Sequence, residues 1–331
     1  MSFAFCMVGC GYMAVSRHGP SCKRYESLHP GSVFAACCDI DVEKTRAFKE
    51  KFDLPNCYTD IRAMLDAERP QAVCLICPVD KTAELSCLIL ERGYPLIMEK
   101  PPGHTISETR RMIECANAAG IPNQVAFNRR YMPLVREFKE LAVKHGGAAG
   151  ITDIQYRMLR VGRNDADFST TAIHGIDLVR HIAGCDYKRV SFTYHDQPGW
   201  EPAAANIHMD CVMESGALAR LDFLPVCGMT TERLEISTER GTFLIRLPMI
   251  NDIDHEGELI YYEKNKKVLE LNGFDAAGCK EDYVLGGFYH ENESFLNDIR
   301  NGVKPQGDIA SGLQSVEVAN CILEKKAVYG A

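Results

Sequence analysis

Residues 3–14 read FAFCMVGCGYMA, an apolar run followed by two glycines and then by residues that allow a helix to start. Such a run predicts a β-strand, a tight turn and a helix, in that order. The pattern Gly9-x-Gly11-x-x-Ala14 lets the backbone turn sharply and approach a pyrophosphate at the positive end of the helix. The stretch therefore predicts the first strand and the phosphate loop of a dinucleotide-binding α/β fold.

The surroundings of the glycine turn matter, because short glycine patterns also occur in ordinary turns. A second apolar run, at 33–38, ends at Asp39. A carboxylate roughly two dozen residues beyond the first helix start can bind the ribose hydroxyls of adenosine; the alternative is a solvated turn residue. The anion would repel a ribose 2′-phosphate, and the next residues, Ile40 and Asp41, include no arginine. The pattern favours NAD over NADP as the cofactor.

The pair Gly19-Pro20 falls where the first helix should still be running. Proline inside a helix lacks an amide hydrogen and costs about 3 kcal/mol unless the helix bends or restarts. We therefore expect a split or kinked helix at this point.

Length and composition limit the class of protein. A chain of 331 residues suggests two domains, and 46% hydrophobic with 25% charged residues is typical of globular proteins. The net charge of −8, without a basic stripe carrying interleaved aromatic residues, argues against a nucleic-acid partner. No apolar run approaches the roughly 20 residues that span a bilayer, and no basic region precedes the first one, so we expect no membrane partner.

The 15 cysteines are odd in number and scattered without a framework. This usage fits reduced thiols in a cytoplasmic protein better than secreted disulfides. Cys74 and Cys77 have a C-x-x-C spacing, but they lie in an apolar run predicted to be a buried strand, where residues three apart point to opposite faces. We interpret both as structural and predict no metal site there.

The first part of the chain, residues 1–127, alternates strand-like and helix-like segments. Such alternation predicts a parallel sheet with helices on both faces, here a Rossmann dinucleotide-binding domain. The predicted strands are 3–8, 33–38, 72–77 and 96–98, and the predicted helices after the first are 42–52, 81–92 and 107–119.

The second part, residues 128–331, has a different texture, in which many short strands are joined by tight turns such as Ser215-Gly216 and Glu239-Arg-Gly241. We expect an α/β domain with one large, mostly antiparallel open sheet. A sheet covered by helices on one side leaves its other face open, so we expect a homodimer or homotetramer formed through this sheet. The predicted strands are 153–158, 189–194, 207–213, 217–224, 233–238, 242–246, 258–263 and 267–271, and the helices are 133–145, 289–301 and 308–329, the last capped by Asp308.

Further short motifs follow the glycine loop: a strand end at Cys77-Pro78, the tripeptide Glu99-Lys100-Pro101, the run AFNRRYMP at 126–133, and His174-Gly-Ile-Asp177 with Gly184. With Gly9-x-Gly11 and Asp39, this ordered set makes the whole chain resemble the glucose–fructose oxidoreductase and myo-inositol dehydrogenase (Gfo/Idh/MocA) family. The resemblance implies a Rossmann domain followed by an α/β domain, and substrates that are mostly sugars, polyols and their derivatives.

The resemblance also implies roles for two residues. Glu99 and Lys100 follow a predicted strand and so fall on the cofactor side of the sheet; the alternative is a surface ion pair at a turn. By the resemblance, Lys100 would lie near the nicotinamide, where its ammonium stabilises alkoxide character on the reacting oxygen. His174 matches the family's catalytic histidine and would accept the hydroxyl proton, a task suited to an imidazole with a pKa of about 6.5; the alternative is a core histidine. The predicted cofactor-binding set is Gly9, Gly11, Tyr12, Met13, Asp39, Cys77, Pro78, Glu99 and Lys100.

The chain departs from the family at Thr170, where members with the full dehydrogenase dyad carry aspartate. A hydroxyl cannot replace a carboxylate as a base. Asp177 shares a helical face with His174 and is expected to orient it or to bind a substrate hydroxyl. His181 extends the same face, which leaves open a metal-binding stripe or simple packing. The predicted substrate-binding residues are Asp177, Arg130, Asn164 and Thr170, and no metal is predicted.

Together these patterns predict an NAD-dependent oxidoreductase that acts on a hydroxyl-bearing carbon of a sugar, polyol or glycoside. One alternative keeps the cofactor but returns the hydride, which gives a redox-neutral glycoside hydrolase or lyase. A second alternative is a non-catalytic, nucleotide-sensing regulator on the same fold. The loss of the aspartate at Thr170 favours the regulator, whereas the presence of Lys100 and His174 argues against it.

Overall fold

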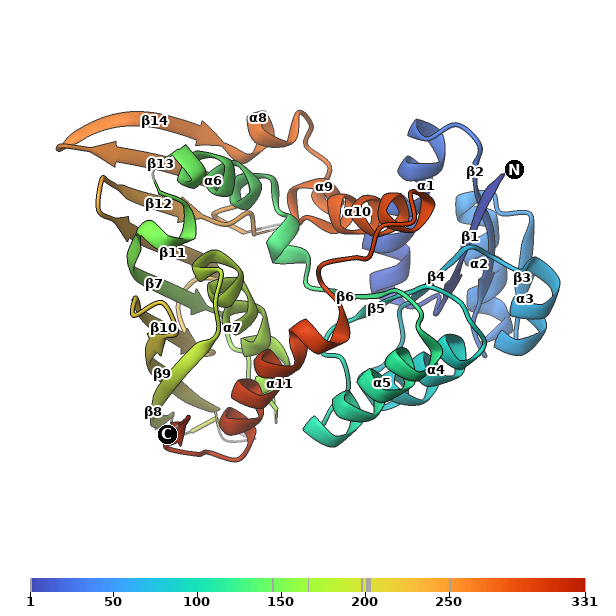
Figure 1. Cartoon of the computed structure of the whole chain (residues 1–331), viewed down its shortest axis with the longest axis horizontal. Helices are drawn as coiled ribbons and strands as arrows, with labels where there is room; N and C mark the ends of the chain where they lie inside the picture. The colour runs from blue at the N-terminus through green and yellow to red at the C-terminus, as the bar shows by residue number, and fades with distance from the viewer. Residues whose placement is uncertain are drawn as a thin grey trace. The chain divides into compact units, whose positions relative to one another are not determined.

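The chain forms two compact units in the computed structural model (Figure 1). Unit 1 contains Met1–Asn128 and Gly287–Leu313, and unit 2 contains Arg129–Gly286 and Gln314–Ala331. The predicted boundary after residue 127 differs by one residue from the first change of unit, but the segment 287–313, which we assigned to the second domain, lies in unit 1. The described residues are 2–144, 146–165, 167–197, 199–200, 204–249 and 252–330.

Unit 1 contains a six-stranded sheet in the order β3-β2-β1-β4-β5-β6, and all its strand pairs are parallel. Most residues of the central strands are buried, as expected for a parallel sheet covered on both faces. This confirms the predicted Rossmann-like α/β fold. The strands are β1 (Phe3–Val8), β2 (Ser32–Cys38), β3 (Asn56–Tyr58), β4 (Ala72–Leu75), β5 (Leu96–Glu99) and β6 (Asn123–Ala126).

The helices of unit 1 pack on both faces of its sheet, α1 with α10 on one and α4 with α5 on the other (Figure 1). Their ends follow ordinary capping chemistry: Asp41 accepts two backbone amides at the start of α2, and Thr105 forms a capping box with Glu108 at the start of α5. The helices are α1 (Gly19–Leu28), α2 (Val42–Phe52), α3 (Ile61–Glu68), α4 (Val79–Glu91), α5 (Ile106–Ala119) and α10 (Phe288–Arg300).

The first helix is irregular where the sequence predicts it. A π-helical turn, η1 (Ala14–His18), precedes α1, and the Gly19 amide donates to the Ala14 carbonyl five residues back. Pro20 then stands in the first turn of α1, where its missing amide hydrogen costs least. A Cβ on Gly19 would lie 2.6 Å from the Phe52 ring, so this turn requires glycine.

Unit 2 contains a nine-stranded sheet in the order β14-β13-β12-β11-β7-β10-β9-β8-β15. The pair β7 and β10 is parallel and the other pairs are antiparallel, which confirms a mostly antiparallel sheet. The strands are β7 (Ile151–Leu159), β8 (Tyr187–Gln197), β9 (Ala204–Met213), β10 (Leu218–Leu224), β11 (Thr231–Thr238), β12 (Thr242–Arg246), β13 (Glu258–Glu263), β14 (Lys266–Asn272) and β15 (Val328–Tyr329).

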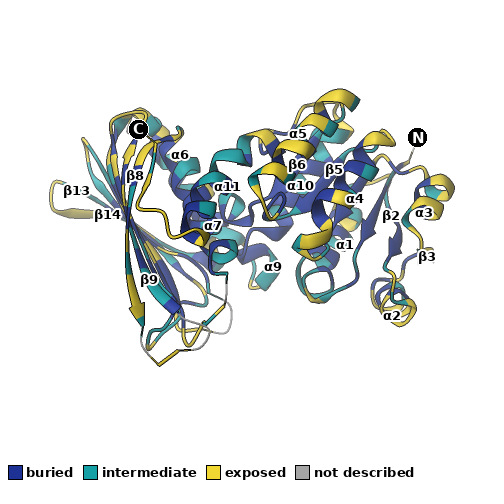
Figure 2. Cartoon of the chain, turned by 90° about the horizontal axis from the view of Figure 1, so that it is seen from below, coloured by how far each residue is buried: buried dark blue, intermediate teal, exposed yellow. Residues whose placement is uncertain are grey.

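Helices cover one face of this sheet, with α6 and α7 packed against its strands (Figure 2). The strands alternate accordingly: Tyr156 and Met158 of β7 are buried, whereas Gln155 and Arg157 point to the other face and are exposed. The helical segments are α6 (Pro133–Lys144), α7 (Ser169–Ala183), α8 (Gly273–Ala277), α9 (Asp282–Leu285) and the short 3-10 turn η3 (Gly147–Gly150), together with η2 (Asn128–Tyr131) and α11 (Ile309–Leu323), which each contain residues of both units.

The open face of the sheet is more polar than the sequence argument assumed. Arg220 of β10 lies 3.5 Å from Asp222 and 4.0 Å from Asp210, and the apolar residues of the strands mostly face the helices. Leu218 and Val212, which are partners across β10 and β9, are nevertheless 55% and 36% exposed on this face. The predicted subunit contact therefore depends on a small exposed apolar area and not on a continuous apolar face.

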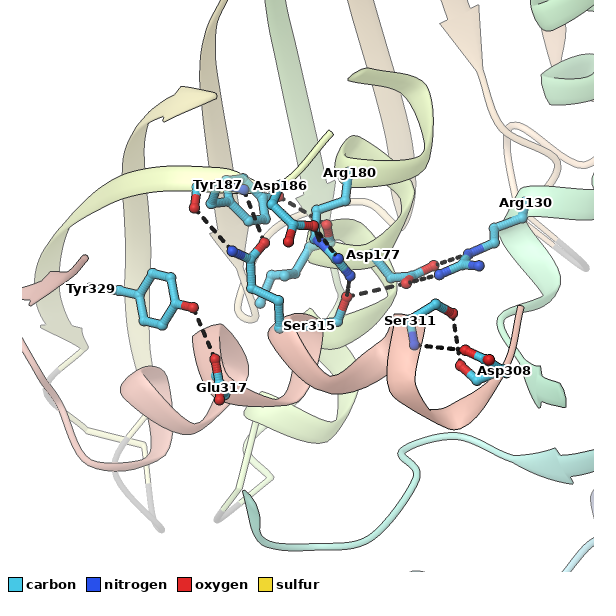
Figure 3. Close-up of polar contacts among 12 residues, drawn as sticks. Arg130, Asp177, Arg180, Asp186, Tyr187, Asp308, Ser311, Ser315, Glu317 and Tyr329 are labelled. Atoms are coloured by element: carbon cyan, nitrogen blue, oxygen red, sulfur yellow. Dashed lines mark hydrogen bonds and ion pairs between the residues drawn. The ribbon is translucent and has the colours of Figure 1, made fainter. Parts of the chain in front are cut away.

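The end of the chain corrects one prediction. The helix predicted at 308–329 ends at Leu323, Lys325 adopts a left-handed backbone with φ 48°, and Val328–Tyr329 pairs with β8. The predicted cap is present, because the Asp308 carboxylate accepts the Ser311 amide at 2.8 Å (Figure 3). The helix predicted at 133–145 is observed as α6; its predicted last residue lies outside the described residues.

All 15 cysteines are free thiols, including Cys74 and Cys77. The Cys74 thiol is buried and directed at Asn292, whereas that of Cys77 lies near Thr82. Burial raises the pKa of Cys77 to about 11, so its thiol stays protonated. Within the part of the chain that the structure describes, no helix combines the length and the apolar character needed to cross a membrane.

Candidate active site

The glycine loop after β1 has the geometry that a bound dinucleotide requires. Gly9 has φ +95°, and a Cβ at this position would lie 1.8 Å from the Ile76 carbonyl oxygen, so only glycine fits. A Cβ on Gly11, by contrast, would meet no heavy atom within 4 Å. The backbone at Gly11 therefore borders open space in which a pyrophosphate can approach it closely.

The predicted cofactor-binding residues follow four adjacent strands of the parallel sheet. Asp39 follows β2, Gly9 to Met13 follow β1, Cys77 and Pro78 follow β4, and Glu99 with Lys100 ends β5. The carboxyl ends of parallel strands lie at one edge, and the chain reverses its direction of winding between β1 and β4. This switch point is where open α/β sheets bind ligands, so the sheet gathers the predicted set at the expected place.

Asp39 is hydrogen-bonded to the glycine loop and is not simply a solvated turn residue. Its Oδ2 accepts the Cys10 amide at 2.8 Å and its Oδ1 accepts the Asp41 amide at 3.0 Å. Each carboxylate oxygen can accept a further hydrogen bond, so these contacts leave capacity for ribose hydroxyls. Tyr12 and Ile40, which flank this loop, are 76% and 94% exposed.

Glu99 is a mostly buried anion next to Lys100, with a side chain that is 12% exposed, and not a surface residue. Its Oε1 lies 3.0 Å from Nε2 of the fully buried His18, and its Oε2 accepts the Lys100 amide at 3.0 Å. Burial alone would raise the pKa of Glu99, but the His18 hydrogen bond and the Lys100 charge outweigh it and hold the pKa below its usual range. The end of β5 therefore carries a fixed negative charge beside the lysine.

Two predicted substrate-binding residues of unit 2 bind each other. Asp177 in α7 is 1% exposed, and its carboxylate forms a two-point ion pair with Arg130, Nε to Oδ2 at 2.7 Å (Figure 3). The hydroxyl of Ser315 also donates to Asp177 at 3.1 Å, and it accepts a hydrogen bond from Arg180 at 2.9 Å. This arrangement favours a positioning role for Asp177 over direct contact with substrate.

The remaining predicted residues of unit 2 lie on or before α7. Thr170 is in its first turn, where the hydroxyl donates to the Asp167 carbonyl at 3.1 Å, and Asn164 lies in the segment between β7 and α7. Burial, with the charges of Lys139 and Arg130, holds the pKa of His181 well below its usual value. Over the described ranges, no three His, Cys, Asp or Glu side chains are placed to hold a metal, so the stripe through His181 gains no support.

A buried charge cluster in unit 2 escaped sequence reasoning. Glu232 is fully buried and binds Arg129 through two contacts of 2.6 Å, Arg160, and the hydroxyl of Tyr156 at 2.8 Å. Burial opposes the charge on Glu232, but the two arginines hold its pKa far below the usual range. Arg129 and Arg160 are thus core ion-pair partners of Glu232. No local pattern links residues 103 positions apart.

Unit 1 contains a second buried carboxyl, Glu291 in the first turn of α10. It is fully buried, and no described residue forms a hydrogen bond with either of its carboxyl oxygens. Burial raises the pKa of Glu291 well above 4.5, and the charge of Glu99 adds to the shift. Folded chains therefore keep this proton at pH values where unfolded chains release it.

Replacing Glu291 by glutamine is expected to remove a pH-dependent loss of stability. In the wild type, stability falls as pH rises above the unfolded value of 4.5 and toward the folded pKa, because only the folded state keeps the proton. The slope of this loss is at most about 1.4 kcal/mol per pH unit. Urea unfolding of both proteins, at steps of about one pH unit between about 5 and about 8, measures it.

The matched control is Glu293→Gln in the same helix. Burial opposes the charge on Glu293, but hydrogen bonds from His290, Tyr289 and His29 hold its pKa at about 2. Its contribution is present above the unfolded value of 4.5 and is lost in acid, so this variant loses stability at neutral pH. A stability difference between wild type and Glu291→Gln that does not change with pH would contradict the prediction.

Comparisons with known sequences agree with the Rossmann fold of unit 1. A profile of the family described as "Oxidoreductase family, NAD-binding Rossmann fold" (GFO_IDH_MocA) matches residues 3–127. D-apiose dehydrogenase of Paraburkholderia graminis is 28% identical over 134 residues, which cover 40% of this chain and 34% of that protein. The chain thus spans about a third of that relative's length in the match. Inositol 2-dehydrogenase 4 of Saccharopolyspora erythraea is 26% identical over 246 residues, 71% of each chain.

Solved structures share the fold over nearly the whole length of the chain. Levoglucosan dehydrogenase, solved in complex with NADH, superposes with a TM-score of 0.80 and covers 99% of this chain and 98% of its own. The sequence identity is 17%, so this likeness concerns the fold alone.

Proposed function

We propose that this chain, which belongs to the Gfo/Idh/MocA family of oxidoreductases, transfers hydride between NAD and a hydroxyl-bearing carbon of a sugar, polyol or glycoside. The observation that carries the proposal is the gathering of the glycine loop, Asp39 and the Glu99–Lys100 pair at adjacent strand ends of one parallel sheet. The names of the relatives, an inositol and an apiose dehydrogenase, support the substrate class.

The cofactor proposed is NAD rather than NADP. Gly9 and Gly11 supply the turn and the bare backbone for its pyrophosphate, and Asp39 is placed to accept its ribose hydroxyls. The carboxylate of Asp39 would repel a 2′-phosphate on the same ribose. When bound, NAD supplies the hydride acceptor; the side chains supply charge and proton transfer.

Lys100 is the proposed electrostatic group. Its ammonium stabilises negative charge that develops on the substrate oxygen as hydride leaves carbon. The adjacent Glu99 anion favours the charged form of the lysine, since opposite charges stabilise each other in a region of low dielectric constant.

His174 in α7 is the proposed proton acceptor. Thr170 offers only a hydroxyl, and Asp177 one turn on is ion-paired with Arg130. The imidazole is therefore the group of this segment best suited to take the hydroxyl proton.

An absorbance screen for NADH formation tests the proposal, with sugars, inositols and glycosides offered alongside NAD or NADP. The expected result is stoichiometric reduction of NAD by one structural class of substrate. Glycoside turnover without net NADH would instead favour a redox-neutral hydrolase or lyase. NAD binding without turnover of any substrate, together with a protein partner, would favour a nucleotide-sensing regulator.

We also propose that the chain forms a homodimer or homotetramer through the open face of its nine-stranded sheet, in the cytoplasm. The exposed pair Leu218 and Val212 on that face supports a subunit contact, although charged residues surround it. Sedimentation equilibrium of the purified chain tests this, and a monomer would contradict it.

A further inference from the structure

A buried hydrogen-bond network lies behind the end of β5. It joins Glu99 to His18 in η1 and, through His18, to Asn292 in α10. We propose that His18 and Asn292 are positioning residues for Lys100, because they orient the Glu99 carboxylate that holds the lysine backbone. This inference rests on the proposed role of Lys100 and deepens it.

The Glu99 carboxylate binds one group on each oxygen. His18 Nε2 lies 3.0 Å from Oε1, and the Lys100 amide donates to Oε2 at 3.0 Å. The His18 side chain is fully buried and that of Glu99 is 12% exposed. A carboxylate is planar and rigid, so rotation that breaks its contact with His18 also moves the oxygen that holds Lys100. A change in the contact between His18 and Glu99 therefore also changes the hydrogen bond that holds the Lys100 backbone.

Asn292 determines which nitrogen of His18 carries the proton. The carbonyl of Phe288 can only accept, so the amide nitrogen of Asn292, 2.7 Å away, must face it and donate. The same nitrogen lies 3.0 Å from Nδ1 of His18, which consequently accepts. The proton of the His18 ring then resides on Nε2, the nitrogen that faces Glu99, and His18 donates to the carboxylate.

The other end of the Asn292 side chain is also occupied. Its Oδ1 accepts the thiols of Cys22 at 4.0 Å and Cys74 at 3.9 Å. Asn292 itself is fully buried. With the oxygen facing thiol donors and the nitrogen facing acceptors, the amide has one orientation that satisfies all its neighbours, and this orientation fixes the ring state of His18.

The irregular turn before Gly19 brings His18 into this network. An inserted residue rotates the following side chains by about 100° around the helix axis, because an α-helix has 3.6 residues per turn. His18 is the last residue of the π-helix η1, and it is fully buried. Wide turns of this kind are often retained where a side chain serves a function. The pair Gly19-Pro20, from which the sequence predicts only a kink, thus follows the irregular turn that brings the His18 side chain into contact with Glu99.

The test compares variants that break the network with one that keeps a donor. Asn292→Leu and His18→Leu remove the donors, whereas His18→Gln keeps an amide N–H that can face Glu99. The matched control is Tyr25→Phe, which deletes a partly buried 2.9 Å hydrogen bond from Tyr25 in α1 to Asn297 in α10, the helix that also carries Asn292, without touching Glu99. Melting temperature is recorded for each variant.

Two readouts are combined: hydrogen exchange of the Lys100 amide by NMR without substrate, and steady-state kcat and KM. The two leucine variants are expected to speed exchange at Lys100 and to lower kcat by about 10- to 100-fold, with KM for NAD changed by less than about threefold. His18→Gln is expected to recover most of the rate, and Tyr25→Phe to leave both readouts near wild type.

The outcomes separate this inference from the proposed function. Exchange at Lys100 that is the same in Asn292→Leu as in Tyr25→Phe overturns the positioning role, whatever the activity. Faster exchange with unchanged kcat also overturns it, while a large rate loss in Lys100→Met leaves the role of the lysine intact. Full activity of Lys100→Met overturns the proposed role of the lysine and, with it, the inference.

Discussion

Glu232→Gln is expected to lower the free energy of unfolding by about 3–5 kcal/mol, the largest stability loss we predict for a single change in this chain. Glu232 is fully buried between Arg129 and Arg160, whose side chains are 9% and 10% exposed. Glutamine keeps the shape but removes the charge, so two guanidinium groups remain in the interior without their counter-ion. Urea unfolding at neutral pH measures the loss.

Two comparisons make this prediction specific. Glu258→Gln breaks an ion pair of the same sheet with Arg246, which is 45% exposed, and should cost no more than about 1 kcal/mol. The contribution of Glu232 is present above the unfolded pKa of 4.5 and is lost only as pH falls toward its much lower folded pKa. A loss no greater than that of Glu258→Gln would refute the buried-charge explanation.

Local patterns predicted most of the fold because the elements of this chain carry strong periodic signals. The apolar run before Gly9, the pattern at 42–52 and the strands at 242–246 and 258–263 appear as β1, α2, β12 and β13 within their predicted bounds. The strands β3 and β6 were not predicted, because with three and four residues they are too short to show an alternating pattern. Such short strands are stabilised by pairing and packing with neighbouring strands more than by the propensities of their own residues.

Pairings between distant segments could not be predicted in this way. His18 meets Asn292 across 274 positions, and Arg130 meets Asp177 across 47. The pattern at 289–301 predicts a helix but does not indicate which sheet the helix covers. The observed helix, α10, belongs to unit 1. The placement of the predicted cofactor-binding residues along one edge of the sheet could be predicted, because the strand ends of a parallel sheet share one edge, a rule that needs only the order of the strands.

His174→Ala is expected to lower kcat by about 10²- to 10⁴-fold while NAD binding is retained, the range typical of a lost general base. The structure narrows the alternatives on α7, because the carboxylate of Asp177 is ion-paired and 1% exposed. A neutral hydroxyl such as that of Thr170 is too weak a base at neutral pH. Steady-state rates with the substrate identified in the screen, together with NADH titrations, measure the two quantities separately.

The matched control is His181→Ala, which removes an imidazole two turns further along the same helix. The pKa of His181 is held well below its usual value by burial and by the charges of Lys139 and Arg130, so its imidazole is a weak base and is not expected to accept the substrate proton. The kcat of His181→Ala should stay within about threefold of wild type.

Added imidazole should restore part of the rate of His174→Ala, because a free base can enter the vacated space and accept the same proton. A His174→Ala protein with wild-type kcat would show that the proton leaves by another route, and an equal fall in NADH affinity and rate would show that His174 acts in binding instead.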